Sequence, residues 1–132
     1  MCDMSYDIPN RTVSPFFIKK YKGEDATGPI EYKQELSHMT DIKIKKYATQ
    51  MKFRLIEGGG QSVYFIGLHD DGTVIGVISD KYFEYCAIMN RICDEITSDI
   101  IGVKMLSTSK LNHYIMKFTI KASFDIDSIF IF

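Results

Sequence analysis

A group of basic residues is concentrated in one short segment of a chain that is otherwise close to neutral. The chain has 132 residues and a formal net charge of −1. The basic residues of this segment are Lys43, Lys45, Lys46, Lys52 and Arg54. Tyr47 and Phe53 lie among them, and basic side chains mixed with aromatic ones are typical of surfaces that bind nucleic acid. The segment therefore predicts a contact with RNA, while a solvated helix face remains the alternative interpretation.

The other patterns that carry chemistry are missing from the sequence. The triplet Gly58-Gly59-Gly60 is not followed by the lysine and Ser or Thr of a phosphate-binding loop, so we interpret it as a helix stop. The histidines are scattered and there is no Cys-x-x-Cys, which argues against a zinc site. No Gly-x-Ser-x-Gly nucleophile motif is present. We therefore predict no catalytic residue, no metal site and no cofactor within this chain.

Two carboxylates, Asp70 and Asp71, directly precede Gly72. An Asp-Gly pair between two apolar runs predicts a tight hairpin turn, in which carboxylates accept hydrogen bonds from backbone amides. A turn role is one interpretation of this pair, and a metal-binding or catalytic role is the other.

The elements that position these residues follow from hydrophobic periodicity. They are a strand over 30–36, a helix capped by Thr40 or Asp41, a hairpin of 63–68 and 73–78, a second helix capped by Ser79 or Asp80, and a second hairpin of 101–107 and 114–121. The order β-α-β-β-α-β-β predicts an α+β fold, with a mixed sheet and two packed helices on one or both of its faces.

Composition sets the domain boundaries and the expected surroundings. All three prolines precede residue 30, so we expect an extended or flexible arm over 1–29, an α+β domain over 30–122 and an apolar strand over 123–132. No apolar run approaches the length of a membrane span, and no signal-peptide layout is seen. The unpaired spacing of the few cysteines favours reduced thiols and a cytoplasmic location. Abundant isoleucine with sparse alanine and arginine hints at a parasite or giant-virus origin.

Several blocks resemble a known family in order and spacing. They are Glu31-Tyr32-Lys33, Thr49-Gln50-Met51-Lys52-Phe53-Arg54-Leu55, Glu57-Gly58-Gly59-Gly60 and Ile66-Gly67-Leu68-His69-Asp70-Asp71-Gly72. Together they resemble the N-terminal domain of the GTP-binding protein 1/2 family, translational GTPases related to elongation factor Tu. The resemblance covers about residues 30–98 and implies a non-catalytic accessory domain that contacts RNA, the ribosome or its own GTPase domain.

The GTPase itself is not part of this resemblance. The chain has no Gly-x-x-x-x-Gly-Lys-[Ser/Thr] and no Asn-Lys-x-Asp, so no GTP-binding residue can be assigned. GTP and Mg²⁺ would belong to a missing GTPase domain, and residues 127–132 would lead into its first strand.

A more distant resemblance is to the AlbA-type core of Schlafen proteins, which share the Glu-aromatic-Lys strand and the Ile-Gly-Val-x-Asp-Asp strand. Some of those proteins cut RNA with a metal held by acidic residues. The resemblance implies Glu31 and Asp70 as candidate nuclease carboxylates, with Glu24 or Glu57 completing the set. We expect no metal-dependent cleavage, because Asp70 has a competing role in the turn and Glu31 can pair with Lys33 or Arg54 instead.

Overall fold

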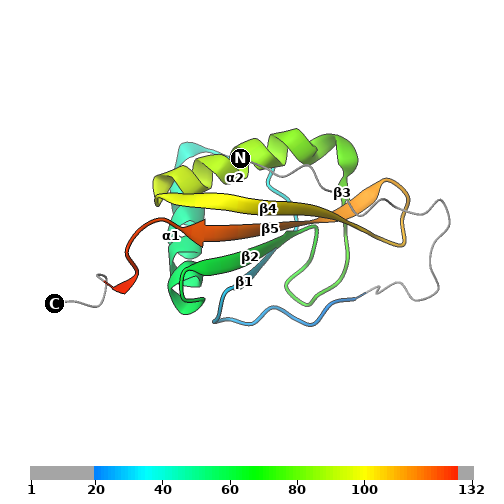
Figure 1. Ribbon diagram of the computed structural model, residues 1–132. Coiled ribbons are helices and arrows are strands. Elements are labelled where there is room, and N and C mark those ends of the chain that lie inside the picture. The colour runs from blue at the N-terminus through cyan, green and yellow to red at the C-terminus, as the bar shows by residue number, and fades with distance from the viewer. Residues whose placement is uncertain (1–19, 128–132) are drawn as a thin grey trace.

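The computed structural model describes residues 20–127 of the chain, and Figure 1 shows their arrangement. The elements in chain order are β1 (Ile30–Lys33), α1 (Asp41–Glu57), β2 (Gln61–Ile66), β3 (Val77–Ile78), the short 3₁₀ helix η1 (Ser79–Lys81), α2 (Tyr82–Glu95), β4 (Ser98–Ser107) and β5 (His113–Ala122). The fold is α+β with a five-stranded mixed sheet, and the expected order of strands and helices is confirmed.

The sheet is built around β5, its longest central strand. β4 pairs antiparallel along one edge of β5, and β2 pairs antiparallel along the other edge. β1 lies outside β2 and runs parallel to it. The β4–β5 hairpin is the second hairpin that the sequence predicts, and it is confirmed over 98–107 and 113–122.

The first expected hairpin is wrong in its pairing. β3 pairs with His113 and Tyr114 of β5 and does not pair with β2. The two predicted arms of the hairpin meet at an isolated bridge between Leu68 and Val74 and at the Gly67 carbonyl, which accepts hydrogen bonds from the Ile75 and Gly76 amides. Gly67 and Gly76 both have positive φ and bend the chain here. β2 ends opposite Met116. The backbone groups of His113 and Tyr114, at the start of β5, are therefore left for β3 to pair with.

The first helix begins and ends as its sequence predicts. The Thr40 hydroxyl accepts a hydrogen bond from the Lys43 amide, which satisfies one free donor of the first turn. Gly58 then forms the C-cap, and Gly59 and Gly60 continue with positive φ.

The second helix begins differently. Neither Ser79 nor Asp80 caps it, because both lie in η1 and α2 begins only at Tyr82. The Ser79 hydroxyl instead donates to the Asn112 side chain in the β4–β5 turn. The expected cap of this helix is therefore wrong, since a tertiary contact takes the side chain that would have made it.

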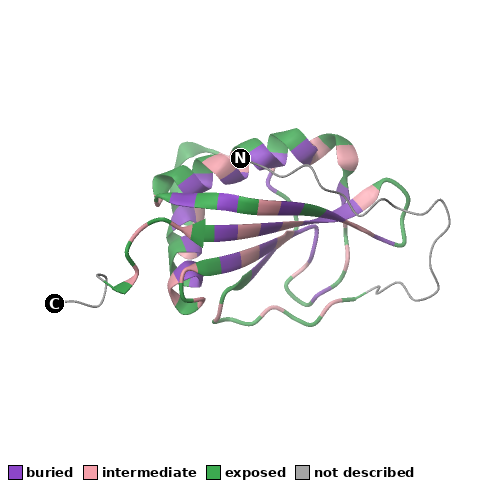
Figure 2. Cartoon of the chain, viewed as in Figure 1, coloured by how far each residue is buried: buried purple, intermediate pink, exposed green. Residues whose placement is uncertain are grey.

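Both helices pack on one face of the sheet and share one core, as the buried stripes in Figure 2 show. α1 contributes Ile44, Ala48, Met51 and Leu55 at helical spacing. A smaller cluster of Tyr32, Leu68 and Ile115 lies on the opposite face. Loop residues such as Val74 cover that cluster, and further along the strands the same face alternates exposed and half-buried side chains. No helix among residues 20–127 is long and apolar enough to cross a membrane.

The segment before β1 is attached to the rest of the fold. The Tyr21 amide donates to the Gly72 carbonyl at 2.7 Å, and the Glu24 amide donates to the Asp70 carbonyl at 2.6 Å. Residues 1–19 of the expected arm lie outside the described residues. At the other end, Phe124 packs against the helix-side core. Of the strand expected over 123–132, residues 123–127 form no strand, and the remaining residues lie outside the described part of the chain.

Candidate functional site

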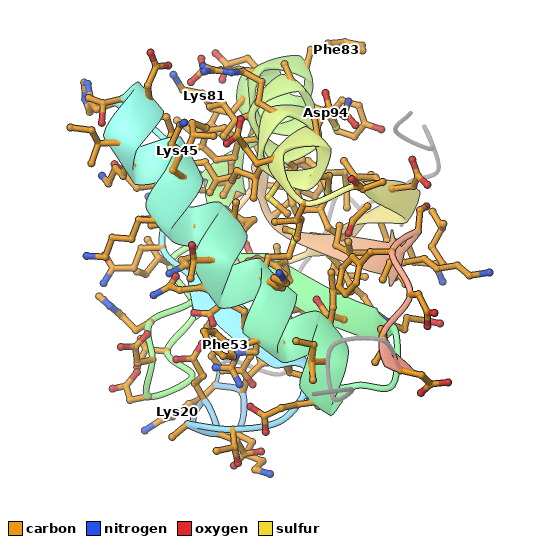
Figure 3. All side chains as sticks on the ribbon, turned by 90° about the vertical axis from the view of Figure 1, so that its left-hand side faces the viewer. Lys20, Lys45, Phe53, Lys81, Phe83 and Asp94 are labelled. Carbon is orange, nitrogen blue, oxygen red and sulfur yellow. The ribbon has the colours of Figure 1, made fainter. Side chains whose placement is uncertain are left out.

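The outer surface of α1 carries four of the five predicted basic residues. Lys43, Lys45, Lys46 and Lys52 are all exposed. Figure 3 views this side of the molecule, with Lys45 and Phe53 labelled on α1. Phe53 is 63% exposed and Ile42 is 83% exposed, so apolar side chains stand among the lysines. We call these four lysines with Ile42 and Phe53 the α1 surface.

Arg54 does not belong to the α1 surface, which corrects the sequence interpretation. It is only 7% exposed. Its Nε donates to the Glu31 carboxylate at 2.9 Å, and its two terminal nitrogens donate to the carbonyls of Gly28 and Asp25, each at 3.0 Å. Three of the five N–H donors of the guanidinium thus join α1 to β1 and to the segment before β1, and its burial keeps it away from the exposed lysines of the α1 surface.

Glu31 lies in the same buried network. Besides Arg54, it has Lys33 Nζ at 3.4 Å from its carboxylate. The expectation that Glu31 pairs with Lys33 or Arg54 is therefore confirmed, and it pairs with both. Lys33 also donates to Gln50 on α1 and stands over the Tyr47 ring, 4.3 Å from its centroid.

Glu24 completes the network from the segment before β1. Its carboxylate accepts the Tyr32 amide at 2.5 Å and lies 3.7 Å from Arg54 Nη2. Burial raises the pKa of Glu24, and the neighbouring carboxylate of Glu31 raises it further. We call Glu24, Glu31, Lys33 and Arg54 the Arg54 cluster.

The second candidate nuclease residue, Asp70, lies in the turn at the sheet end. It is exposed, and its carbonyl accepts the Glu24 amide. The carboxylate that serves the turn is that of Asp71, which accepts the Thr73 amide at 2.9 Å. This hydrogen bonding to Thr73 lowers the pKa of Asp71.

The contacts of these carboxylates hold segments of the chain together. Within residues 20–127 no group of three or more His, Cys, Asp or Glu side chains is placed to hold a metal ion. The Arg54 guanidinium supplies positive charge between Glu24 and Glu31. A cavity of about 430 Å³ opens beside it, lined by Glu24, Ala26, Glu31, Gln50, Phe53, Arg54 and Glu57. The Glu57 carboxylate accepts a hydrogen bond from the Gly28 amide at 3.0 Å.

A second cavity of about 550 Å³ lies between α1 and the end of α2. It is lined by Lys45, Ala48, Thr49, Lys52, Phe53, Ile56, Glu95 and Ile96. Its floor is mostly apolar and its rim carries two lysines of the α1 surface. The sequence did not indicate this groove, because its walls come from the separate ends of two helices.

Comparison with known proteins gives partial similarities. GTP-binding protein 2 of Mus musculus and of Homo sapiens are each 34% identical to this chain over 77 residues, which is 58% of this chain and 13% of each relative. This chain is similar to part of a GTP-binding protein. An uncharacterised protein of Acanthamoeba polyphaga mimivirus, R625, is 36% identical over 85 residues, 64% of this chain and 46% of that protein. No protein-family model matches the chain, and no solved structure matches it significantly.

These relatives bear on the expectations from the sequence. The chain spans less than half of the mimivirus protein and a small part of GTP-binding protein 2. Similarity to a segment of a GTP-binding protein fits the expectation that this chain is not itself an enzyme. A relative from a giant virus agrees with the origin that the composition hints at.

Proposed function

We propose that this chain is a non-catalytic N-terminal accessory domain of a translational GTPase, and that its α1 surface contacts RNA or the ribosome in the cytoplasm. The observation that carries the proposal is the similarity over 77 residues to GTP-binding protein 2, in a chain that lacks both GTP-binding motifs. GTP and Mg²⁺ would be held by the GTPase domain of the whole protein.

The state of the lysines supports an electrostatic contact. Among the described residues, none of Lys43, Lys45 or Lys46 has a carboxylate within ion-pair distance. Lys52 stands over the Phe124 ring at 6.0 Å. Unpaired lysines on one helix face can neutralise phosphates and release counterions, which makes binding salt-dependent.

The apolar members of the same surface favour a second candidate, contact with the protein's own GTPase domain. Exposed aromatic and branched side chains at a surface mark protein contacts more than phosphate contacts. Phe53 lines both cavities described above, so a partner side chain could dock beside it. Replacing Phe53 with Ser would weaken this contact, whereas replacing lysines would weaken the RNA contact.

The test of the RNA contact is binding of ribosomal RNA to the purified chain at several salt concentrations. The variant K45E/K46E should weaken binding about equally for different sequences and should reduce the salt slope by roughly one for each lysine. The control K81E/K110E makes the same change of charge outside α1, at the end of η1 and in the turn between β4 and β5. Unchanged RNA affinity in K45E/K46E would overturn the proposed contact.

A further inference from the structure

One lateral row of side chains crosses four strands on the face opposite the helices. Tyr32 on β1 lies beside Phe65 on β2, Phe65 lies opposite Lys117 on β5, and Lys117 lies opposite Lys104 on β4. Directly paired residues point to the same face of a sheet. α1 passes behind the strands in Figure 1, so this row is on the face turned toward the viewer. Tyr32 is buried in the smaller cluster, so we call Phe65, Lys117 and Lys104 with their neighbours Thr119, Lys121 and Gly102 the open face.

The two lysines at one end of the row repel each other. Lys104 and Lys117 are direct cross-strand partners, and like charges in this position are unfavourable. Neither has a carboxylate within ion-pair distance among residues 20–127. An edge-strand lysine can serve to block strand pairing, but Lys117 lies on the central strand, where no edge needs protection. An anion placed between the two lysines would relieve their repulsion.

The strands that form the open face carry more positive than negative charges. β2, β4 and β5 together carry three lysines and a single acidic residue, Asp99. Asp99 lies opposite Lys121 at the far end and accepts a hydrogen bond from the Ser123 hydroxyl at 2.7 Å. It therefore does not neutralise the pair of Lys104 and Lys117.

The aromatic end of the row adjoins the lysines. The Phe65 ring is half-buried, with Lys117 Nζ 6.0 Å from its centroid. The rings of Tyr32 and Tyr21 also contact it, with centroids 5.8 Å and 5.9 Å away. A fixed aromatic ring beside lysines is the combination that holds an unpaired base and its phosphate.

The neighbouring row leaves room above the sheet. Gly102 lies opposite Thr119, so this row carries small side chains on β4 and β5 before it continues to Val63 on β2 and Ile30 on β1. A Cβ added at Gly102 would meet no atom within 4 Å. The part of this row on β4 and β5 lies between Lys104 and Lys117 on one side and Lys121 on the other, so an extended chain could lie there with basic side chains on both flanks.

From this arrangement we infer that the open face binds single-stranded RNA, with Lys104, Lys117 and Lys121 on phosphates and a base against Phe65. This surface is separate from the α1 surface, and the inference stands whether or not α1 contacts RNA. A single strand fits better than a duplex, because a flat sheet face with an aromatic ring can reach only bases that are unpaired.

The experiment measures fluorescence anisotropy of a labelled single-stranded RNA of about 12 nucleotides with the whole chain at several salt concentrations. K104E/K117E should weaken binding about tenfold or more and should flatten the log–log salt slope by about 1.4, because each phosphate contact to a single strand contributes about 0.7. K81E/K110E provides the control of equal charge change. K45E/K46E is a separate arm that reports only on the α1 surface, so the two proposals fail independently.

A second pair of variants tests the inference even if K104E/K117E does not fold. Gly102→Glu places a carboxylate in the open space between the lysines, and Gly102→Gln places a neutral side chain of the same shape there. We expect G102E to weaken binding several-fold and G102Q to stay within about twofold, with equal melting temperatures. Equal affinities of both variants and the parent would overturn the inference. Equal binding of a duplex, or of a poly-glutamate peptide in place of RNA, would overturn it as well.

Discussion

The guanidinium of Arg54 lies 2.9 Å from the carboxylate of Glu31, and both side chains are about nine-tenths buried. Burial of two charges is costly unless the remaining donors and acceptors are also satisfied. Here the carbonyls of Gly28 and Asp25 accept hydrogen bonds from two further guanidinium donors, and Lys33 approaches the second carboxylate oxygen. The pair therefore joins a helix, a strand and the segment before that strand.

Removal of Arg54 should destabilise the fold strongly. Arg54→Ala leaves the Glu31 carboxylate buried without its main partner, and such changes typically cost about 3–5 kcal/mol. Urea unfolding followed by circular dichroism measures the free energy of unfolding. Arg91→Ala is the control, because Arg91 pairs with Asp41 at 2.8 Å on the surface, where a pair contributes below about 1 kcal/mol. Equal effects of the two variants would contradict the role assigned to Arg54.

The stability should depend on pH through Glu24. The folded pKa of Glu24 is raised above its ordinary value of 4.5, so the folded state holds this proton more tightly than the unfolded state. The contribution to stability is complete below pH 4.5 and is lost as the pH rises through the folded pKa. Glu24→Gln keeps an acceptor for the Tyr32 amide and should remove this part of the decline. Parallel pH profiles for the two proteins would count against the shift.

The variant Tyr64→Phe, which removes the Tyr64 hydroxyl, should not destabilise the protein. Among the described residues, the Tyr64 hydroxyl is buried and has no hydrogen-bond partner. Loss of an unsatisfied polar group is neutral or stabilising by about 1 kcal/mol. Tyr85→Phe is the matched control, because the Tyr85 hydroxyl lies 3.2 Å from the Ser37 hydroxyl and its loss should cost about 1 kcal/mol. Thermal melting of both variants tests the difference, and a lower melting temperature for Y64F than for Y85F would disprove it.

The purified chain should not cleave RNA with a divalent metal. The Arg54 guanidinium lies between the carboxylates of Glu24 and Glu31, where a cation would otherwise have to bind. Incubation with transfer RNA and Mg²⁺ or Mn²⁺ tests this expectation. Asp70→Asn is the informative control, because Asp70 is exposed and the substitution leaves the Arg54 cluster intact. Cleavage by the parent that D70N abolishes would favour the Schlafen-like alternative.

The parts of the fold that depend on local pattern could be predicted from the sequence. The Thr40 cap and the β4–β5 hairpin follow from residues close to each other in the chain. The pairing of β3 could not be predicted, because it depends on where β2 ends relative to β5. In the sequence, Arg54 is one more basic residue among the lysines of this segment. Only the structure shows that it lies on the buried side of α1.

The open face could not be found from the sequence for a related reason. Phe65, Lys104 and Lys117 are far apart in the chain, and only the strand register places them in one row. The alternation within each strand indicates which side chains share a face, but it does not indicate which strands are neighbours.

The attachment of Arg54 to Asp25 and Gly28 limits how far the protein can be shortened. A fragment that starts at Ile30 would delete both carbonyl partners of the guanidinium, along with Glu24. It would also remove Tyr21, whose carbonyl oxygen lies so close to Gly72 that a Cβ there would stand 1.9 Å away. We therefore expect a fragment that starts at Ile30 to be less stable than one that starts at about residue 20, upstream of the first strand.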